Sequence, residues 1–129
     1  MKVGIIGSGG REHAICEILK KSSKIDKIFC IPGNAGTEEI AENINIELSN
    51  FENIKNFILE REIDLVIIGP ERPLVDGLVD YLEQSKIKVF GPNRIASQLE
   101  GSKIFTKKLC QKYNIPTAKF GIFKNSNDA

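Results

Sequence analysis

A glycine-rich turn near the start of the chain constrains its fold more than any other feature. The turn, Gly7-Ser8-Gly9-Gly10, follows the apolar run 3–6 and precedes the segment 11–21, where apolar residues recur at helical spacing. A buried strand, a tight turn and a helix form the opening of a βαβ unit, whose first helical N–H groups face the end of the strand. Glycines there leave room for an anion, because they carry no Cβ. The sequence therefore predicts an α/β fold with a phosphate cradle at this turn.

The residues beyond the turn alternate between strand and helix patterns. Predicted strands cover 2–7, 27–31, 64–69, 87–90 and 117–123, and a short one includes Ile44 and Ile46. Predicted helices cover 11–21, 51–62, 74–85, 93–100 and 102–113. This alternation favours parallel strands joined by right-handed crossovers. We therefore expect a doubly wound, Rossmann-like parallel sheet of about five strands flanked by helices.

Some of these elements carry more specific expectations. The apolar run 65–68 indicates a strand buried on both faces, as in the middle of a parallel sheet. Ser49 or Asn50 is suited to cap the helix at 51–62. In the first helix we expect one apolar stripe to face the core, made of Ala14, Ile15, Ile18 and Leu19.

Composition and charge narrow the class of protein. The chain has 129 residues, 41% hydrophobic and 27% charged, which suits one soluble domain with a hydrophobic core. No apolar run approaches the roughly 18 residues of a membrane-spanning helix. The first residues do not resemble a signal peptide either, so we expect a cytoplasmic protein without a membrane partner. A net charge of +1 gives no indication of nucleic-acid binding.

The charges are unevenly distributed. Residues 1–100 carry 12 basic and 16 acidic side chains, whereas residues 101–129 carry 6 and 1. The basic tail is either a solvated helix face or a surface that helps to hold a polyphosphate. Cys16, Cys30 and Cys110 are too far apart for a zinc or C-x-x-C redox motif, and we expect reduced thiols, the first two in the core.

The turn does not fit the common nucleotide motifs. Glu12 stands where a dinucleotide fingerprint has its third glycine, and the second strand ends in 30–32 without the acid that would hold a ribose. No Walker A motif occurs. A smaller phosphorylated ligand remains, with Arg11 suited to bind its phosphate. His13 and Glu12 either contact that ligand or are ordinary polar residues of a first helical turn.

Three further loops lie at the same predicted edge of the sheet. They cover 32–37, 69–73 and 91–93, and ligands of open α/β sheets bind outside the carboxyl ends of the strands. Glu71, between two prolines, could accept a hydrogen bond from an amine or a sugar hydroxyl, although a lone acid is more often a surface residue. The four loops together would enclose a ligand the size of a ribose.

Six segments carry a resemblance to a known family. They are G-S-G-G-R-E-H at 7–13, P-G-N-A-G-T at 32–37, D-L-V-I-I-G-P-E-R-P-L-V at 64–75, F-G-P at 90–92, Q-L-E-G-S-K at 98–103 and I-P-T-A at 115–118. In this order and spacing the chain resembles the N-terminal part of the phosphoribosylamine–glycine ligases, members of the ATP-grasp superfamily. One position departs from the pattern, because the family more often has a small or acidic residue at Arg72.

The resemblance implies an ATP-dependent ligase of de novo purine biosynthesis. In that family ATP phosphorylates the carboxylate of glycine, and the amine of 5-phosphoribosylamine attacks the glycyl phosphate. The products are glycinamide ribonucleotide, ADP and phosphate, and magnesium or manganese bridges the ATP oxygens. It also implies that residues 1–100 form a substrate-binding domain that precedes the ATP-grasp domain. Residues 101–129 would then be a linker helix and the first strand of a truncated ATP-grasp domain.

The resemblance also assigns roles to single residues. Lys103 is similar to the first nucleotide-contacting lysine of ATP-grasp enzymes. The expected substrate-binding residues are Gly7, Ser8, Gly9, Gly10, Arg11, Glu12, His13, Asn34, Gly36, Thr37, Pro70 and Glu71. We expect no catalytic or metal-ligating residue here, because the glycine site, the metal and most of the ATP site belong to the rest of the family's chain. The chain alone should therefore make no glycinamide ribonucleotide, and no obligate protein partner is indicated.

Two other classes of function stay open at this point. One is a phosphate-binding or nucleotide-binding module that acts by itself without catalysis. The other is a dinucleotide-dependent oxidoreductase, against which the incomplete glycine fingerprint argues.

Overall fold

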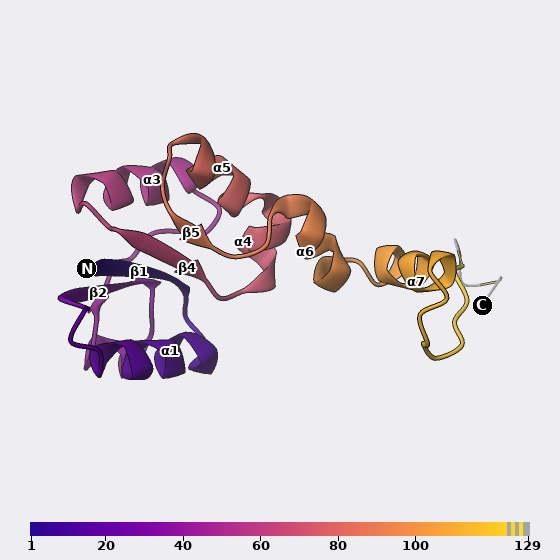
Figure 1. Cartoon of the computed structure of the whole chain (residues 1–129), viewed down its shortest axis with the longest axis horizontal. Coiled ribbons are helices and arrows are strands. Elements are labelled where there is room, and N and C mark those ends of the chain that lie inside the picture. The colour runs from indigo at the N-terminus through magenta and orange to yellow at the C-terminus, as the bar shows by residue number, and fades with distance from the viewer. Residues whose placement is uncertain (124, 126, 128–129) are drawn as a thin grey trace.

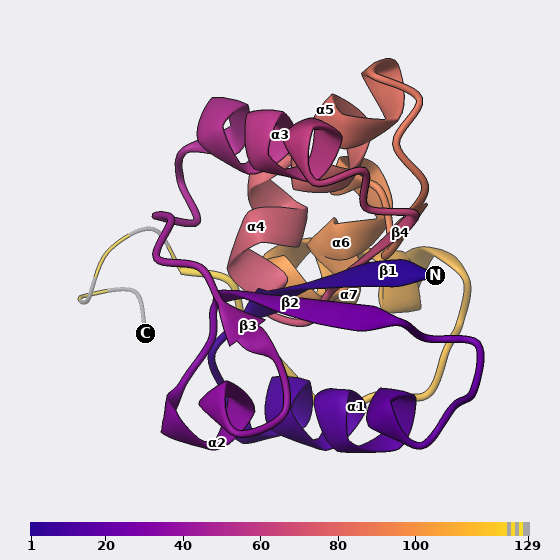
Figure 2. The ribbon, with the colours of Figure 1, turned by 90° about the vertical axis from the view of Figure 1, so that its left-hand side faces the viewer.

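A parallel sheet lies at the centre of the molecule. The computed structural model describes residues 1–123, 125 and 127, and among these the sheet has five strands in the order β3-β2-β1-β4-β5 (Figures 1 and 2). The strands are β1 (Lys2–Gly7), β2 (Lys27–Pro32), β3 (Glu42–Asn43), β4 (Leu65–Ile68) and β5 (Val89–Phe90). All neighbouring pairs are parallel. The predicted doubly wound α/β fold is confirmed.

Helices cover both faces of the sheet. Figure 2 shows α1 (Gly10–Lys20) and α2 (Ala35–Glu38) on one face, and α3 (Phe51–Glu60), α4 (Glu71–Asp76) and α5 (Leu78–Gln84) on the other. The chain therefore changes face after β3, and the strand order reverses between β1 and β4. That reversal is the point at which open α/β sheets bind their ligands.

The central strand β1 supplies residues to two separate cores, because successive side chains of a strand point to opposite faces. Ile5 is fully buried with Cys16 and Cys30 beneath α1, as expected for these two cysteines. Ile6 is fully buried on the other face with residues of α3 and α5 such as Ile54. Each of these isoleucines contributes about 1.5–3 kcal/mol by its burial.

Helix α1 is rotated from the predicted orientation. Ala14 and Ile18 face solvent, Ile18 with 68% exposure, so their predicted place in the core is wrong. Ile15 and Leu19 do pack against the core, beside Cys16. The unexpected inward residue is Glu12, which is 3% exposed. Its carboxylate occupies a space next to Gly7 and Gly69, at the ends of β1 and β4. The buried face of α1 therefore includes Glu12 and Cys16 and leaves Ala14 exposed.

Local structure differs from the prediction at several boundaries. The loop 32–37 contains the start of α2, and the loop 70–73 is already the first turn of α4. The short third strand lies at Glu42–Asn43 rather than at Ile44 and Ile46. The single helix expected over 74–85 is divided into α4 and α5 by Gly77, which has a φ of +99°. The predicted cap of α3 is confirmed, because the Asn50 side chain accepts from the N–H of Asn53.

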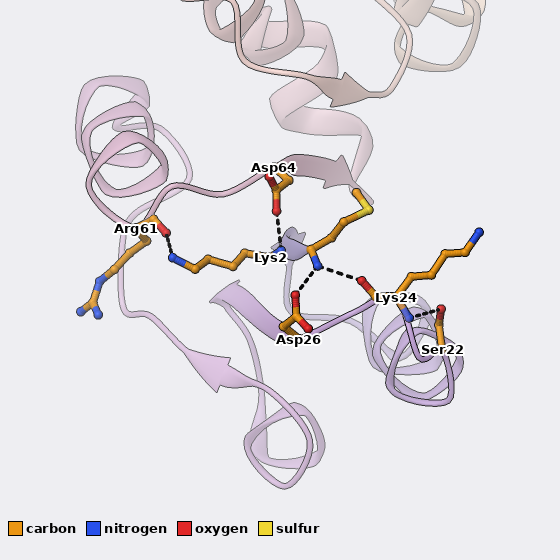
Figure 3. Close-up of polar contacts among 7 residues, drawn as sticks. Lys2, Ser22, Lys24, Asp26, Arg61 and Asp64 are labelled. Carbon is orange, nitrogen blue, oxygen red and sulfur yellow. Dashed lines mark hydrogen bonds and ion pairs between the residues drawn. The ribbon is translucent and has the colours of Figure 1, made fainter.

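Polar contacts hold the edge of the sheet opposite the glycine turn (Figure 3). The amino group of Met1 donates to the carboxylate of Asp26 and to the Lys24 carbonyl. The N–H of Lys2 donates to Asp64 at 2.7 Å, and its Nζ donates to the Arg61 carbonyl at 2.8 Å. These contacts join the N-terminal ends of β1, β2 and β4. The C-terminal ends of the three strands lie next to one another, with Gly7 beside Pro32 and Ile6 beside Ile68.

The chain leaves the α/β layers after the sheet. Helix α6 (Arg94–Gly101) contacts α4, and α7 (Lys103–Lys112) lies beyond α6 and buries no residue (Figure 1). The strand predicted over 117–123 is wrong, because these residues are irregular and no strand among the described residues pairs with them. Lys107 instead donates to Thr117 and the Ala118 carbonyl. The predicted segment 101–129 also includes 124, 126, 128 and 129, which lie outside the described residues. None of the described helices has the length and apolar character needed to cross a membrane.

Candidate functional site

The candidate site lies where β1 ends beside β2 and β4. The N–H of Gly33 donates to the Gly7 carbonyl, and the N–H of Gly69 donates to the Ile6 carbonyl, each at 3.1 Å. These two bonds fix the loops after β2 and β4 against the turn after β1. The structure thus brings the glycine turn together with the predicted neighbours Asn34, Gly36 and Thr37, as described next.

Glu12 supports the turn from below. Its Oε2 accepts from the N–H of Gly9, the N-cap residue of α1, at 2.6 Å. A Cβ on Gly7 would lie 2.7 Å from the Glu12 carboxyl carbon, and one on Gly69 would overlap Oε1. The glycines at these two positions therefore accommodate the buried carboxylate. Glu12 is only 3% exposed, so its carboxylate contacts the backbone of the turn rather than solvent.

The second oxygen of Glu12 is only partly compensated. Oε1 is buried and has no hydrogen-bond partner among the described residues. The Nε of Arg11 lies 3.5 Å from it, which is an ion-pair distance. The Arg11 side chain is itself 61% exposed, so it lies between the buried acid and solvent.

Asn34 joins the loop after β2 to the turn. Its Nδ2 donates to the Ser8 carbonyl at 2.8 Å and lies 3.4 Å from the Gly9 carbonyl. Its Oδ1 accepts from the N–H of Thr37 at 3.0 Å and so caps α2. One side chain therefore fixes both the start of α2 and the backbone of the glycine turn.

His13 packs on the same loop. A Cβ on Gly36 would lie 2.6 Å from the imidazole Cε1 of His13, so a larger residue there would displace the imidazole from this position. The imidazole Nε2 also lies 3.8 Å from a carboxylate oxygen of Glu17, one turn further along α1. Figure 2 shows α1 and α2 side by side on this face of the sheet.

The outer surface of the turn is open. Ser8, Gly9, Gly10 and Arg11 are all exposed, and a Cβ on Gly10 would meet nothing within 4 Å. The N–H groups of Gly10 and Arg11 belong to the first turn of α1, where a helix has no carbonyl to accept from them. Unpaired N–H groups, the positive end of a helix dipole and a guanidinium thus lie together.

Pro70 and Glu71 lie at the end of β4, the strand next to β1. Pro70 is the N-cap residue of α4 and Glu71 is its exposed first residue. Arg72 pairs with Asp76 rather than with Glu71, at 2.7 Å. The hydrogen bond and the charge of Asp76 raise the pKa of Arg72. Glu71 therefore lies just beyond the C-terminal end of β4, and its position is fixed by the first turn of α4 rather than by an irregular loop.

Lys103 is separate from the turn. It is the exposed first residue of α7, which begins after the cap Ser102 and lies outside the α/β layers (Figure 1). Among the residues that the structure describes, no group of three His, Cys, Asp or Glu side chains is placed to hold a metal ion.

Comparison with known proteins identifies the family. The family model described as phosphoribosylglycinamide synthetase, N domain, matches residues 1–100. The chain belongs to this family. A phosphoribosylamine–glycine ligase from Caldanaerobacter subterraneus is 47% identical over the whole chain, and one from Brucella melitensis is 49% identical. The chain spans about 31% and 30% of the lengths of these two relatives.

Solved structures agree with this assignment. A crystal structure of a phosphoribosylamine–glycine ligase from Thermotoga maritima superimposes with a TM-score of 0.66 at 32% identity, over 94% of this chain and 27% of that one. An N5-carboxyaminoimidazole ribonucleotide synthetase from the same organism gives a TM-score of 0.72 at 19% identity, over 98% of this chain and 34% of that one. The second likeness shows the shared fold alone.

Sequence analysis missed two residues that shape the site of this family member. Gly69 makes room for Glu12, and Asn43 at the end of β3 contacts both Asn34 and Thr37. The G-P dipeptide at 69–70 indicated only a turn. No local signal marks Asn43, because its partners are six and nine residues away in the sequence.

Proposed function

We propose that this chain is the part of a purine-biosynthetic ligase that binds a sugar phosphate, 5-phosphoribosylamine, at the glycine turn. The ligase would join that amine to glycine at the expense of ATP. Membership of the family and the printed names of its relatives support this proposal. The observation that carries it is the exposed start of α1, where unpaired N–H groups lie beside Arg11.

Phosphate binding at this turn rests on simple electrostatics. N–H groups of the first helical turn donate to an anion, and the helix dipole favours negative charge there. Arg11 adds a planar cation that can donate two parallel hydrogen bonds to phosphate. Gly10 leaves space for the oxygens, since a side chain would stand in their way. Ser8 and His13 flank this space and complete the proposed binding surface.

The other predicted residues either fix the backbone of the turn or lie on the opposite side of the proposed ligand. Glu12, Asn34, Gly36 and Thr37 hold the turn in place through the contacts described above. Glu71 and Pro70, after the neighbouring strand β4, would face the sugar, and the Glu71 carboxylate suits an amine or a hydroxyl. In this proposal the buried Glu12 positions the backbone and does not contact the ligand.

The chain's own residues would bind and orient the nucleophile. Holding the sugar phosphate fixes its amine, so that attack on an acyl phosphate becomes a reaction between oriented groups. An acyl phosphate is a better electrophile than a free carboxylate, because phosphate is the better leaving group. In the proposal Lys103 contacts ATP. Magnesium or manganese would be bound by the part of the relatives that this chain does not span, and the protein would work in the cytoplasm.

Titration with ribose 5-phosphate tests the proposed site. We expect saturable binding with amide chemical-shift changes at Ser8 to Arg11, weakening as salt is raised. Arg11→Ala should reduce the affinity roughly tenfold, the scale of one hydrogen bond to a charged group. Arg72→Ala is the matched control, since it removes an exposed arginine that is paired with Asp76. Equal loss in both variants, or shift changes confined to other surfaces, would contradict the proposal.

An activity assay tests the wider proposal. We expect this chain, mixed with glycine, ATP and 5-phosphoribosylamine, to form no glycinamide ribonucleotide. The reason is that the chain spans about 31% of the length of a relative named as this ligase, and the proposal places most of the ATP site in the part that it does not span. Product formation at the rate of a full-length relative would show that the chain carries more of the machinery than we propose.

A further inference from the structure

A ring of three hydrogen bonds lies behind the proposed site and joins Asn34, Thr37 and Asn43. The N–H of Asn34 donates to Thr37 Oγ1 at 2.7 Å, and Asn43 Nδ2 donates to the Asn34 carbonyl at 2.7 Å. Thr37 Oγ1 lies 2.7 Å from Asn43 Oδ1 and 2.9 Å from the Asn34 carbonyl. A hydroxyl has one proton, and the two lone pairs of the Asn34 carbonyl already accept from Asn43 and from the N–H of Glu38, at 3.1 Å. We therefore assign the Thr37 proton to Asn43 Oδ1, which closes the ring.

The fold fixes Asn43 at this place. Asn43 is the last residue of β3, and its backbone is in register with Cys30 of β2. Gly33 leaves the space that the amide occupies, because a Cβ there would overlap Asn43 Oδ1. Gly33 also has a φ of +77°, which disfavours other residues. Sheet pairing on one side and a glycine on the other thus hold the side chain.

The ring aims Asn34 at the glycine turn. The N–H of Asn34 is bound to Thr37, and its carbonyl accepts from Asn43 and from the N–H of Glu38, so both polar groups of its backbone are fixed. Its side chain then donates to the Ser8 carbonyl at 2.8 Å. A continuous path of contacts therefore leads from Asn43, on the edge strand, to the backbone of the proposed phosphate cradle.

We propose that Asn43 is a positioning residue for sugar-phosphate binding and that it acts through Asn34. This inference rests on the proposed function of the turn. Asn43 never touches the ligand; it holds the Asn34 backbone so that the amide of Asn34 fixes Ser8 and Gly9. The role needs a short side chain that both donates and accepts, and an amide meets both needs.

Asn43→Asp tests the donor. The variant keeps the size of the side chain, but a carboxylate has no proton to give and would face the Asn34 carbonyl. We expect the dissociation constant for ribose 5-phosphate at pH 8 to rise about fivefold or more. A protonated aspartic acid regains one donor, so the loss should shrink as the pH falls toward 4.5. A purely structural residue would lower the melting temperature without this pH-dependent change of affinity in the folded protein.

Asn45→Asp is the matched control. Asn45 is exposed, two residues further on, and the substitution adds the same negative charge. Asn43 lines a surface hollow with other titratable side chains, namely Lys20, Asp26, Lys27, Glu38, Glu39 and Glu42. Both variants share these groups, His13 and the titrating phosphate of the probe. The ratio of the two dissociation constants at each pH therefore reports on residue 43 itself.

The outcomes separate this inference from the function on which it rests. If the unaltered chain does not bind ribose 5-phosphate, the proposed function fails. If it binds and the two variants agree within about twofold at pH 8, or their ratio does not change with pH, the role of Asn43 is wrong. Asn43→Ser, which adds no charge, serves if the aspartate variant is unfolded at pH 8. A serine is too short to reach both partners, so we expect weaker binding at every pH, and unchanged binding would overturn the inference.

Discussion

At the scale of single residues, the glycines at the ligand edge serve two different purposes. Gly69 makes room for Glu12, whereas Gly10 faces open space. We predict that Gly69→Ala displaces the Glu12 carboxylate and lowers the free energy of unfolding by about 1–3 kcal/mol, the cost of overpacking. Denaturant unfolding measures this. Gly10→Ala should leave stability unchanged or slightly higher and should weaken ribose 5-phosphate binding. Similar stability losses at both positions would contradict this division.

The two buried thiols give a second prediction at this scale. Burial, with a further contribution from Cys30, raises the pKa of Cys16 to about 12, and burial also raises that of Cys30. Thiolates are the reactive form, so a thiol reagent at pH 8 should modify only Cys110 in the folded chain. Cys110→Ser should then show no fast reaction until denaturant is added. Rapid modification of this variant in its folded state would be inconsistent with the packing.

The same shifts have a consequence for stability at high pH. The unfolded chain releases a thiol proton near the ordinary pKa of 9.0, whereas the folded Cys16 keeps its proton to about 12. Folding therefore gains from a protonated thiol below pH 9, and this gain is lost as the pH rises from 9 toward 12. Thermal unfolding across that range should follow this direction, and a Cys16→Ala variant should show a shallower decline.

At the scale of the elements, Gly77 decides how the chain covers one face of the sheet. It ends α4 and begins α5 with a φ of +99°. Gly77→Ala should cost about 1–2 kcal/mol, because an L-residue with a Cβ is disfavoured there. Lys86, after α5, has a φ of +60°, so Lys86→Gly is the converse test and should be neutral or stabilising. Chemical denaturation should show a loss of stability for Gly77→Ala and no loss for Lys86→Gly; a destabilisation by both would refute the argument.

The elements also show what can be predicted from the sequence. Strands β1, β2, β4 and β5 followed from apolar runs and glycine punctuation, and the cap at Asn50 followed from residue type. The third strand lies elsewhere than predicted, and the one expected over 117–123 does not form. The rotation of α1 was not predicted. A glutamate in a helix is expected to be exposed, and Glu12 is buried only because Gly7 and Gly69, the latter distant in sequence, leave space for its carboxylate. Asn43 was missed for the same reason, since its value comes from contacts across β2 and β3. Periodicity predicts elements well, but polar residues buried by distant loops leave no local pattern.

At the scale of the whole molecule, the two parts of the chain differ in how they are held. Residues 1–90 form layers around two cores and α6 packs on α4, whereas α7 buries no residue. Exposed apolar side chains gather in the last part of the chain, namely Ile104, Phe105, Tyr113, Ile115, Phe120, Ile122 and Phe123. The excess of basic charge lies there too. This segment therefore contributes little to the stability of the fold and much to the exposed apolar surface, which favours self-association.

Removal of residues 103–129 tests that division. Because α7 adds no core residue, we predict that the shortened chain keeps its free energy of unfolding within about 1 kcal/mol, the scale of surface changes. It should also self-associate less at high concentration, since the exposed apolar side chains are gone. Calorimetry measures the first effect and light scattering the second. A chain in which residues 103–129 are replaced by a Gly-Ser segment of equal length controls for chain length. A loss of several kcal/mol would mean that α7 stabilises the layers through α6, its packing neighbour.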